Sequence, residues 1–105
     1  MKAQFQIWRG DRERGQLVPY ATEVTEGMVV LDAVHQIQAE SANDLAVRWN
    51  CKAGKCGSCS AEVNGIPRLM CMTRMSELPV GEPITVEPMR AFPVIKDLEI
   101  GRAHV

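Results

Sequence analysis

Four cysteines constrain this chain more than any other feature of its sequence, because thiols at short, fixed spacing usually share one structural task. Three of them fall close together, with four and then two residues between them, and the fourth follows after eleven more residues. These residues are Cys51, Cys56, Cys59 and Cys71. Three near thiolates and one distant thiolate suit a compact iron–sulfur cluster, in which each iron takes two thiolates and bridging sulfides complete the core.

The spacing points to one type of cluster. Plant-type [2Fe–2S] ferredoxins open with the same C-x4-C-x2-C spacing and carry a fourth cysteine further along the chain. Gly54 and Gly57 flank Cys56, and glycine lets a backbone pass close to a cluster. Backbone N–H groups between Lys52 and Ser60 can then bond the cluster sulfurs and tune the reduction potential. The sequence therefore predicts a [2Fe–2S] cluster with all four cysteines as its ligands.

Three other uses of the cysteines stay open. A zinc site usually pairs two CxxC hooks, whereas only Cys56 and Cys59 form such a hook here. Disulfides suit exported chains, and a thioredoxin-type CxxC belongs at a helix start after a strand. The single hook disfavours zinc, the lack of an export signal disfavours disulfides, and the glycine-rich segment around Gly57 disfavours a thioredoxin-type motif.

The amino terminus and the overall charge bear on where the chain works. The first ten residues alternate polar and apolar side chains without the hydrophobic run of an export signal. No stretch approaches the roughly 18 apolar residues of a membrane span. We therefore expect a cytoplasmic protein with reduced thiols and without direct membrane insertion. The formal net charge of −1 gives no push toward nucleic acid, so no nucleic-acid partner is expected.

Hydrophobic periodicity predicts a hairpin at the start of the chain. Lys2–Trp8 alternates between apolar and polar residues, as a half-buried strand does. Arg9–Gly15 is polar and contains two glycines, which indicates a turn. Gln16–Val24 is a second expected strand, in which Pro19 fits best on a sheet edge or at a bulge because it cannot donate to the ladder.

The period then changes to that of a helix. Val30, Val34 and Ile37 fall on one face of an amphipathic helix expected over Met28–Glu40, and Ser41–Asp44 would end it. Beyond the cysteine-rich segment the expected elements are short, and each follows a turn or proline signal. They are a hairpin over Ala61–Leu69 turning at Asn64-Gly65, a helical turn over Thr73–Leu78, a strand over Ile84–Glu87 and an extended tail punctuated by Pro88 and Pro93.

This order of elements predicts an α+β fold. A mixed sheet crossed by one main helix, as in a β-grasp domain, is compatible with it, although composition alone would not choose that arrangement over other α+β folds. Residues 1–98 are expected to form one ferredoxin-like domain, and residues 99–105 a tail of unassigned role.

Basic residues accumulate among the predicted ligands, where only Glu62 opposes them. They are Arg48, Lys52, Lys55, Arg68 and Arg74. Positive charge near a cluster favours its reduced, more negative state and so raises its potential, and it suits a fixed interface with another subunit. Ordinary solvated loop charge is the alternative, above all for Arg68 and Arg74.

Three runs of the chain resemble the iron–sulfur subunit of succinate dehydrogenases and fumarate reductases. Arg48–Cys59 resembles the cluster loop of that family, and Pro67–Arg74 resembles its fourth-ligand segment. Pro88–Leu98 is similar to the stretch that leads out of the family's first domain. The similarity extends from about Phe5 to Leu98, and actinobacterial members resemble the chain most.

The resemblance implies a β-grasp domain whose [2Fe–2S] cluster is part of an electron wire. In the family, a flavoprotein subunit interconverts succinate and fumarate at FAD. Electrons then cross this cluster to further clusters and reach quinone in a membrane anchor. The expected partners are therefore the FAD subunit and, through a second domain, the membrane-anchor subunit. A peripheral position on the inner face of the cytoplasmic membrane would follow from that assembly.

A different assembly is the alternative. The family's second domain needs several further cysteines, and this sequence has none to spare beyond the four. A stand-alone [2Fe–2S] ferredoxin that serves another reductase or oxygenase would explain this. The sequence shows no nucleophile–base set and no phosphate loop, so we expect one-electron transfer and no catalysis from this chain alone.

Overall fold

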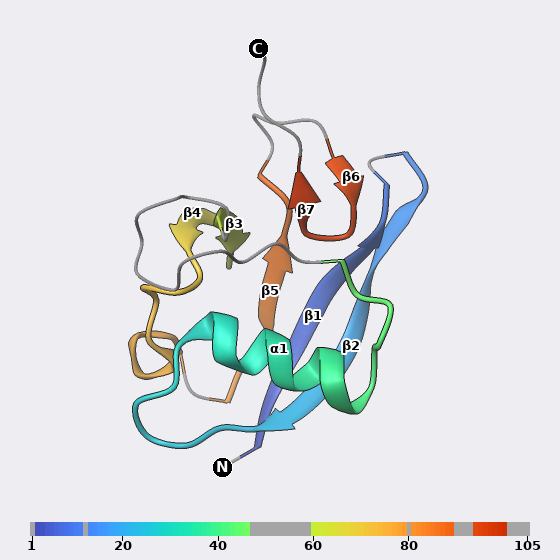
Figure 1. Cartoon of the computed structure of the whole chain (residues 1–105). Coiled ribbons are helices and arrows are strands. Elements are labelled where there is room, and N and C mark those ends of the chain that lie inside the picture. Colours follow the sequence, from blue (N-terminus) through green and yellow to red (C-terminus); the bar gives the residue numbers. More distant parts are fainter. Residues whose placement is uncertain (1, 12, 47–59, 80, 90–93, 101–105) are drawn as a thin grey trace.

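A mixed β-sheet and a single α-helix build the part of the chain that the computed structural model describes, residues 2–11, 13–46, 60–79, 81–89 and 94–100 (Figure 1). The elements, in chain order, are β1 (Lys2–Gly10), β2 (Gly15–Glu23), α1 (Val30–Glu40), β3 (Ser60–Val63), β4 (Ile66–Leu69), a 3-10 helix (Met75–Glu77), β5 (Ile84–Glu87), β6 (Val94–Lys96) and β7 (Glu99–Ile100). The described residues contain no helix of the length and apolarity that crossing a bilayer requires.

The large sheet has the strand order β2-β1-β5-β3-β4. The central strand, β5, runs parallel to its neighbour β1, whereas the other neighbouring pairs are antiparallel. Helix α1 crosses one face of this sheet (Figure 1). The predicted α+β fold with a mixed sheet and one crossing helix is therefore confirmed, and it is a β-grasp arrangement.

The N-terminal hairpin forms as its alternation predicts. Ala3, Phe5 and Ile7 are buried on one face of β1, which pairs with β2 along its whole length. The strands reach further into the turn than expected, since β1 ends at Gly10 and β2 begins at Gly15. Pro19 lies in β2, the edge strand, where a missing N–H costs the sheet nothing.

Helix α1 supplies the other half of the core. Its apolar face, which includes Val30, Leu31, Val34 and Ile37, is fully buried with the inward residues of β1, β3 and β5. The helix begins two residues later than predicted, after Met28 and Val29, and ends as predicted at Glu40. Burial of such side chains contributes about 1.5–3 kcal/mol each, so this face fixes the helix against the sheet.

The second hairpin turns where the sequence predicts. Asn64 and Gly65 have φ of 52° and 82°, the positive pair that a two-residue hairpin with matching twist demands. Asn64 also bonds the next strand, because its side-chain oxygen accepts from the N–H of Thr85 at 2.9 Å. The predicted helical turn and last main strand are present as the 3-10 helix and β5.

The C-terminal region differs from the expected extended tail. Strands β6 and β7 pair as a small antiparallel hairpin. Asp97 stands at its turn with φ of 51°, a left-handed conformation that Asp and Asn tolerate better than most residues. Its side chain is fully buried. Polar bonds to distant segments hold this turn, and hydrophobic periodicity carries no signal for such bonds.

Candidate iron–sulfur site

Cys71 is the predicted ligand that the described residues include. It follows the end of β4 and is 6% exposed, at the margin of the apolar core. Cys51, Cys56 and Cys59 lie outside the described residues, as do most of the glycine-rich segment and the basic residues Arg48, Lys52 and Lys55. A buried thiolate fits an iron–sulfur cluster, because thiolate sulfur is the ligand such clusters use and because the surrounding protein limits access of water.

The start of α1 holds the Cys71 segment through backbone bonds. The N–H of Val30 donates to the carbonyl of Thr73 at 2.8 Å, and the N–H of Leu31 donates to the carbonyl of Met70 at 3.0 Å. These amides belong to the first helical turn, where no carbonyl within the helix can accept from them. We call this pair of bonds the helix-start clamp. It brackets Cys71 on both sides and places the positive end of a helix dipole beside a ligand segment.

Two further bonds shape the same segment. The hydroxyl of Thr73 donates to the carbonyl of Leu69 at 2.9 Å, and the N–H of Met72 donates to that carbonyl at 3.0 Å. Thr73 itself is buried. The chain therefore leaves β4 through a tight, internally bonded turn, which fixes the backbone that carries Cys71.

The β3–β4 hairpin brings two parts of the predicted ligand set toward each other. Ser60 and Leu69 are register partners at the open end of this hairpin. Cys59 is bonded to Ser60, and Cys71 follows Leu69 by two residues. The register therefore places Ser60, which follows Cys59 in the chain, beside Leu69, which precedes Cys71 by two residues.

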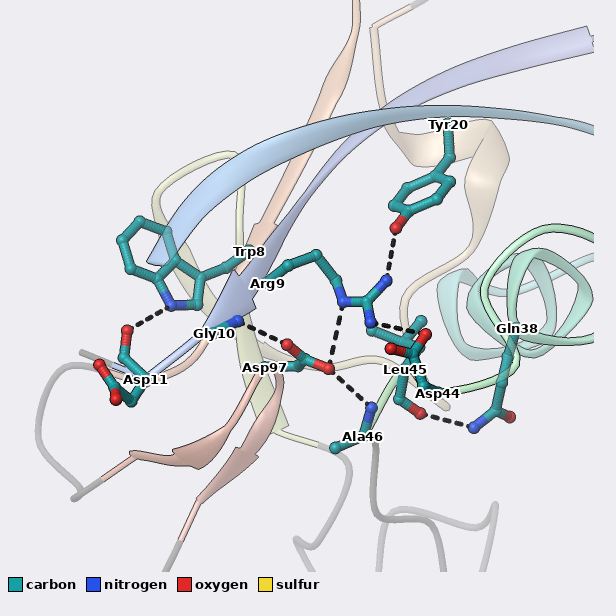
Figure 2. Close-up of polar contacts among 10 residues, drawn as sticks. All are labelled: Trp8, Arg9, Gly10, Asp11, Tyr20, Gln38, Asp44, Leu45, Ala46 and Asp97. Carbon is teal, nitrogen blue, oxygen red and sulfur yellow. Dashed lines mark hydrogen bonds and ion pairs between the residues drawn. The ribbon is translucent and has the colours of Figure 1, made fainter. Parts of the chain in front are cut away.

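The buried carboxylate of Asp97 collects polar contacts from distant segments of the chain (Figure 2). Asp97 accepts from the N–H of Gly10 through Oδ1 at 2.6 Å and from the N–H of Ala46 through Oδ2 at 2.9 Å. The guanidinium of Arg9 forms an ion pair with the same carboxylate, with Nε 3.2 Å from Oδ2. We call these three contacts the carboxylate clamp. Ala46 directly precedes the segment that contains the first three predicted ligands.

Backbone bonds reinforce the carboxylate clamp. The N–H of Asp97 donates to the carbonyl of Gly10 at 2.9 Å, and the N–H of Leu98 donates to the carbonyl of Ala46 at 3.1 Å. The β6–β7 turn is thus bonded to the end of β1 and to the chain before residue 47. On the helix side, Gln38 donates to the carbonyl of Leu45 at 2.7 Å (Figure 2). Leu45 and Ala46, which precede the segment of the first three predicted ligands, are therefore bonded both by α1 and by the β6–β7 turn.

Arg9 stays charged within this cluster. Burial works against its guanidinium, but a 2.8 Å contact with Asp44, a 2.6 Å hydrogen bond to the hydroxyl of Tyr20 and the charge of Asp97 outweigh that effect. The pKa of Arg9 is therefore raised above its ordinary value. The positive charge remains in place at every pH at which a protein of this kind works, so Asp97 keeps its counter-charge.

The expected basic surround is described in part. Arg68 lies 3.8 Å from Glu77, so part of its charge is balanced by a neighbour, and Arg74 is exposed. Exposed pairs of this kind contribute little to stability. Met72 next to Cys71 is 59% exposed, whereas Met70 on its other side is buried in the core. The segment that carries Cys71 therefore has one face in the core and one face at the surface.

Sequence reasoning missed the carboxylate clamp. It treated Arg9 as part of a turn and Asp97 as part of a family-like tail. In the sequence Asp97 lies between Lys96 and Leu98, and that context names no bonding partner. The clamp joins three segments that are distant in the sequence, its own included, so only the fold brings them together.

Comparison with known proteins gives a consistent set of relatives. Residues 4–105 match the family described as "2Fe-2S iron-sulfur cluster binding domain". The fumarate reductase iron-sulfur subunit of Mycobacterium tuberculosis (strain CDC 1551 / Oshkosh) is 41% identical over 81 residues, covering 77% of this chain and 32% of that protein. The fumarate reductase iron-sulfur subunit of Escherichia coli O6:H1 is 36% identical over 87 residues, covering 83% of this chain and 33% of that protein.

A solved structure agrees with these relatives. The Mycobacterium smegmatis Sdh1 complex in the apo form contains a chain that is 59% identical, with a TM-score of 0.91. The match covers 95% of this chain and 42% of that chain. The sequence described here thus spans about a third of the length of the two fumarate reductase subunits and less than half of the solved chain.

Proposed function

The chain belongs to the family of 2Fe-2S iron-sulfur cluster binding domains, and from that premise we propose that it carries single electrons within a succinate dehydrogenase or fumarate reductase. Its cofactor is a [2Fe–2S] cluster. The observation that carries the proposal is the agreement of fold and sequence with the Sdh1 complex, at a TM-score of 0.91 and 59% identity. When bound, the cluster supplies reversible one-electron redox chemistry.

The proposed ligands are the four cysteines. Cys51, Cys56, Cys59 and Cys71 supply the four thiolates that a [2Fe–2S] core needs. Burial of Cys71 and the pairing of Ser60 with Leu69 support this assignment. The chain's own groups would then act on the site in two ways. The helix-start clamp fixes the backbone at Cys71, and the core beneath that residue limits water and so helps to set the potential.

The proposed partners follow from the relatives. We place a flavoprotein subunit with FAD on one side of the electron path and quinone at a membrane-anchor subunit on the other. Residues 1–98 would form the ferredoxin-like domain, and residues 99–105 a tail of unassigned role, whose first two residues pair with β6. The assembly would lie in the cytoplasm, peripheral on the inner face of the cytoplasmic membrane. Exposed Met72 beside Cys71 suits electron exchange with a docked subunit, since soft side chains pack well at interfaces.

A potentiometric titration of the anaerobically purified protein tests the proposal. Iron and acid-labile sulfide are first determined, and the titration is then followed by visible absorption and EPR. A one-electron [2Fe–2S] signal with a potential near that of the succinate/fumarate couple supports the respiratory role. The same signal near about −400 mV, the range of plant-type ferredoxins, would instead indicate a stand-alone shuttle for another reductase or oxygenase. Zinc without iron or sulfide would overturn the cluster itself.

A further inference from the structure

We infer that Asp97 is a positioning residue for the cluster, acting through the backbone at Ala46 rather than through any contact with iron or sulfur. The inference rests on the proposed function, because it concerns how the fold holds the segment that carries the first three ligands. The β6–β7 turn thereby becomes part of the cluster site, although it stands far from the cysteines in sequence.

The contacts of Asp97 carry the first step. Its carboxylate is fully buried and accepts from Gly10 and Ala46 while it faces the guanidinium of Arg9. Such charge-assisted bonds are about twice as strong as neutral ones. A buried carboxylate is costly unless its oxygens are satisfied, and here two backbone N–H groups donate to it while the guanidinium of Arg9 supplies the counter-charge. The geometry of Ala46 is therefore tied to the end of β1.

The position of Ala46 carries the second step. Thirteen residues lie between Ala46 and Ser60 in the sequence, and Ser60 is fixed by its pairing with Leu69. A ligand segment whose two ends are fixed has fewer conformations to lose when it wraps a cluster. If the Ala46 end were released, the thiolates would bind the cluster in a broader range of geometries, and the cluster would dissociate faster.

The third step distinguishes an effect on the geometry of the cluster site from an effect on the stability of the fold. Arg9 contacts Asp44 as well as Asp97, and Asp44 is 73% exposed. Asp44→Ala is thus a matched control, since it disturbs the same guanidinium and leaves the bond from Ala46 to Asp97 in place. Asp97→Asn is the matched test. Asn also tolerates the positive φ of 51°, but its amide has one acceptor oxygen, so it cannot accept from both N–H groups through separate oxygens as the carboxylate does.

The experiment uses the cluster-loaded protein under conditions in which far-UV circular dichroism shows each variant folded. Cluster loss to excess iron chelator is followed by visible absorption, and low-temperature EPR spectra are recorded. We expect Asp97→Asn to lose the cluster about tenfold faster than the unaltered protein, as one unmade buried hydrogen bond would allow, with a broadened or shifted EPR signal. We expect Asp44→Ala to stay within about twofold.

The outcomes are distinct. An Asp97→Asn protein with the unaltered loss rate and EPR spectrum overturns the inference and leaves the proposed function standing. Unaltered protein that binds no cluster overturns both. If Asp97→Asn does not fold, the Arg9→Lys protein is tested in its place. This substitution keeps the carboxylate of Asp97 and removes the planar guanidinium that orients that carboxylate. A smaller but measurable acceleration then supports the inference, and an unaltered rate and spectrum reject it.

Discussion

The helix-start clamp and the carboxylate clamp hold two parts of the same site by different chemistry. At Cys71 the bonds join backbone amides of α1 to backbone carbonyls, so they persist whatever side chains stand at those positions. At Ala46 the side chain of Asp97 accepts from the backbone N–H beside a backbone bond from Leu98, so one substitution removes part of the anchor. The difference shows that one site can combine an anchor made of backbone with one that depends in part on a single side chain.

The substitution with the largest expected effect removes the predicted ligand at the helix-start clamp. Cys71→Ala removes one thiolate from the set of four, and a [2Fe–2S] core needs all four. We expect loss of nearly all cluster absorption, while far-UV circular dichroism stays close to that of the unaltered protein because the clamp is made of backbone. Met72→Ala is the control, since its side chain is exposed and should leave the cluster in place. Full iron and sulfide content in Cys71→Ala would contradict the ligand assignment.

The next effect tests the carboxylate clamp by its removal. Asp97→Ala leaves the guanidinium of Arg9 and the N–H groups of Gly10 and Ala46 without this acceptor. We expect the free energy of unfolding to fall by about 3 kcal/mol, in the range for breaking a buried charged pair from one side. Urea unfolding monitored by fluorescence measures it. A loss below about 1 kcal/mol would mean that the clamp contributes little, and the contrast between the two clamps would disappear.

A smaller effect tests the same clamp through its backbone. Gly10 has φ of 112°, and a Cβ added there would collide with the carbonyl oxygen of Arg14. Gly10→Ala should therefore cost about 2 kcal/mol and misplace the N–H that binds Asp97. Gly65→Ala is the control. Gly65 also has positive φ, but nothing lies near the added Cβ, so about 1 kcal/mol is expected. Equal urea midpoints for the two variants would contradict the crowding at Gly10.

The smallest effect probes whether side chains matter at the helix-start clamp. Thr73→Val removes the hydroxyl that bonds the carbonyl of Leu69 and keeps the carbonyl that accepts from Val30. A neutral hydrogen bond of this kind contributes about 1 kcal/mol, and cluster content should not change. Urea unfolding and visible absorption check both expectations. A loss as large as that of Asp97→Ala would show that this clamp, too, depends on a side chain.

The sequence predicts those parts of the fold that local pattern governs. Alternation places Phe5 and Ile7 in the core, and the Asn64-Gly65 pair locates a hairpin turn, because burial and positive φ leave a trace in neighbouring residues. The position of Cys71 just beyond that hairpin follows from the same reasoning. The cysteine spacing predicts the cofactor and the family resemblance implies the same one, which the match to the cluster-binding family confirms.

The sequence does not predict the contacts that join distant segments. Nothing near Asp97 indicates that its carboxylate binds Gly10 and Ala46, because each bond depends on how β1, the chain before residue 47 and the β6–β7 turn are arranged in space. The late hairpin was missed for the same reason, and an extended tail was expected instead. Electrostatic contacts of this kind have no periodicity, so a pattern search does not find them.

The carboxylate clamp also has a consequence for the order of events during synthesis. Asp97 stands 87 residues after Gly10 and 51 residues after Ala46. A ribosome that adds about 5–20 residues per second finishes Ala46 roughly 3–10 s before it reaches Asp97. Cys71, the last of the four cysteines, is complete before Asp97 exists. The helix-start clamp, whose partners all lie at or before Thr73, can therefore form before the carboxylate clamp.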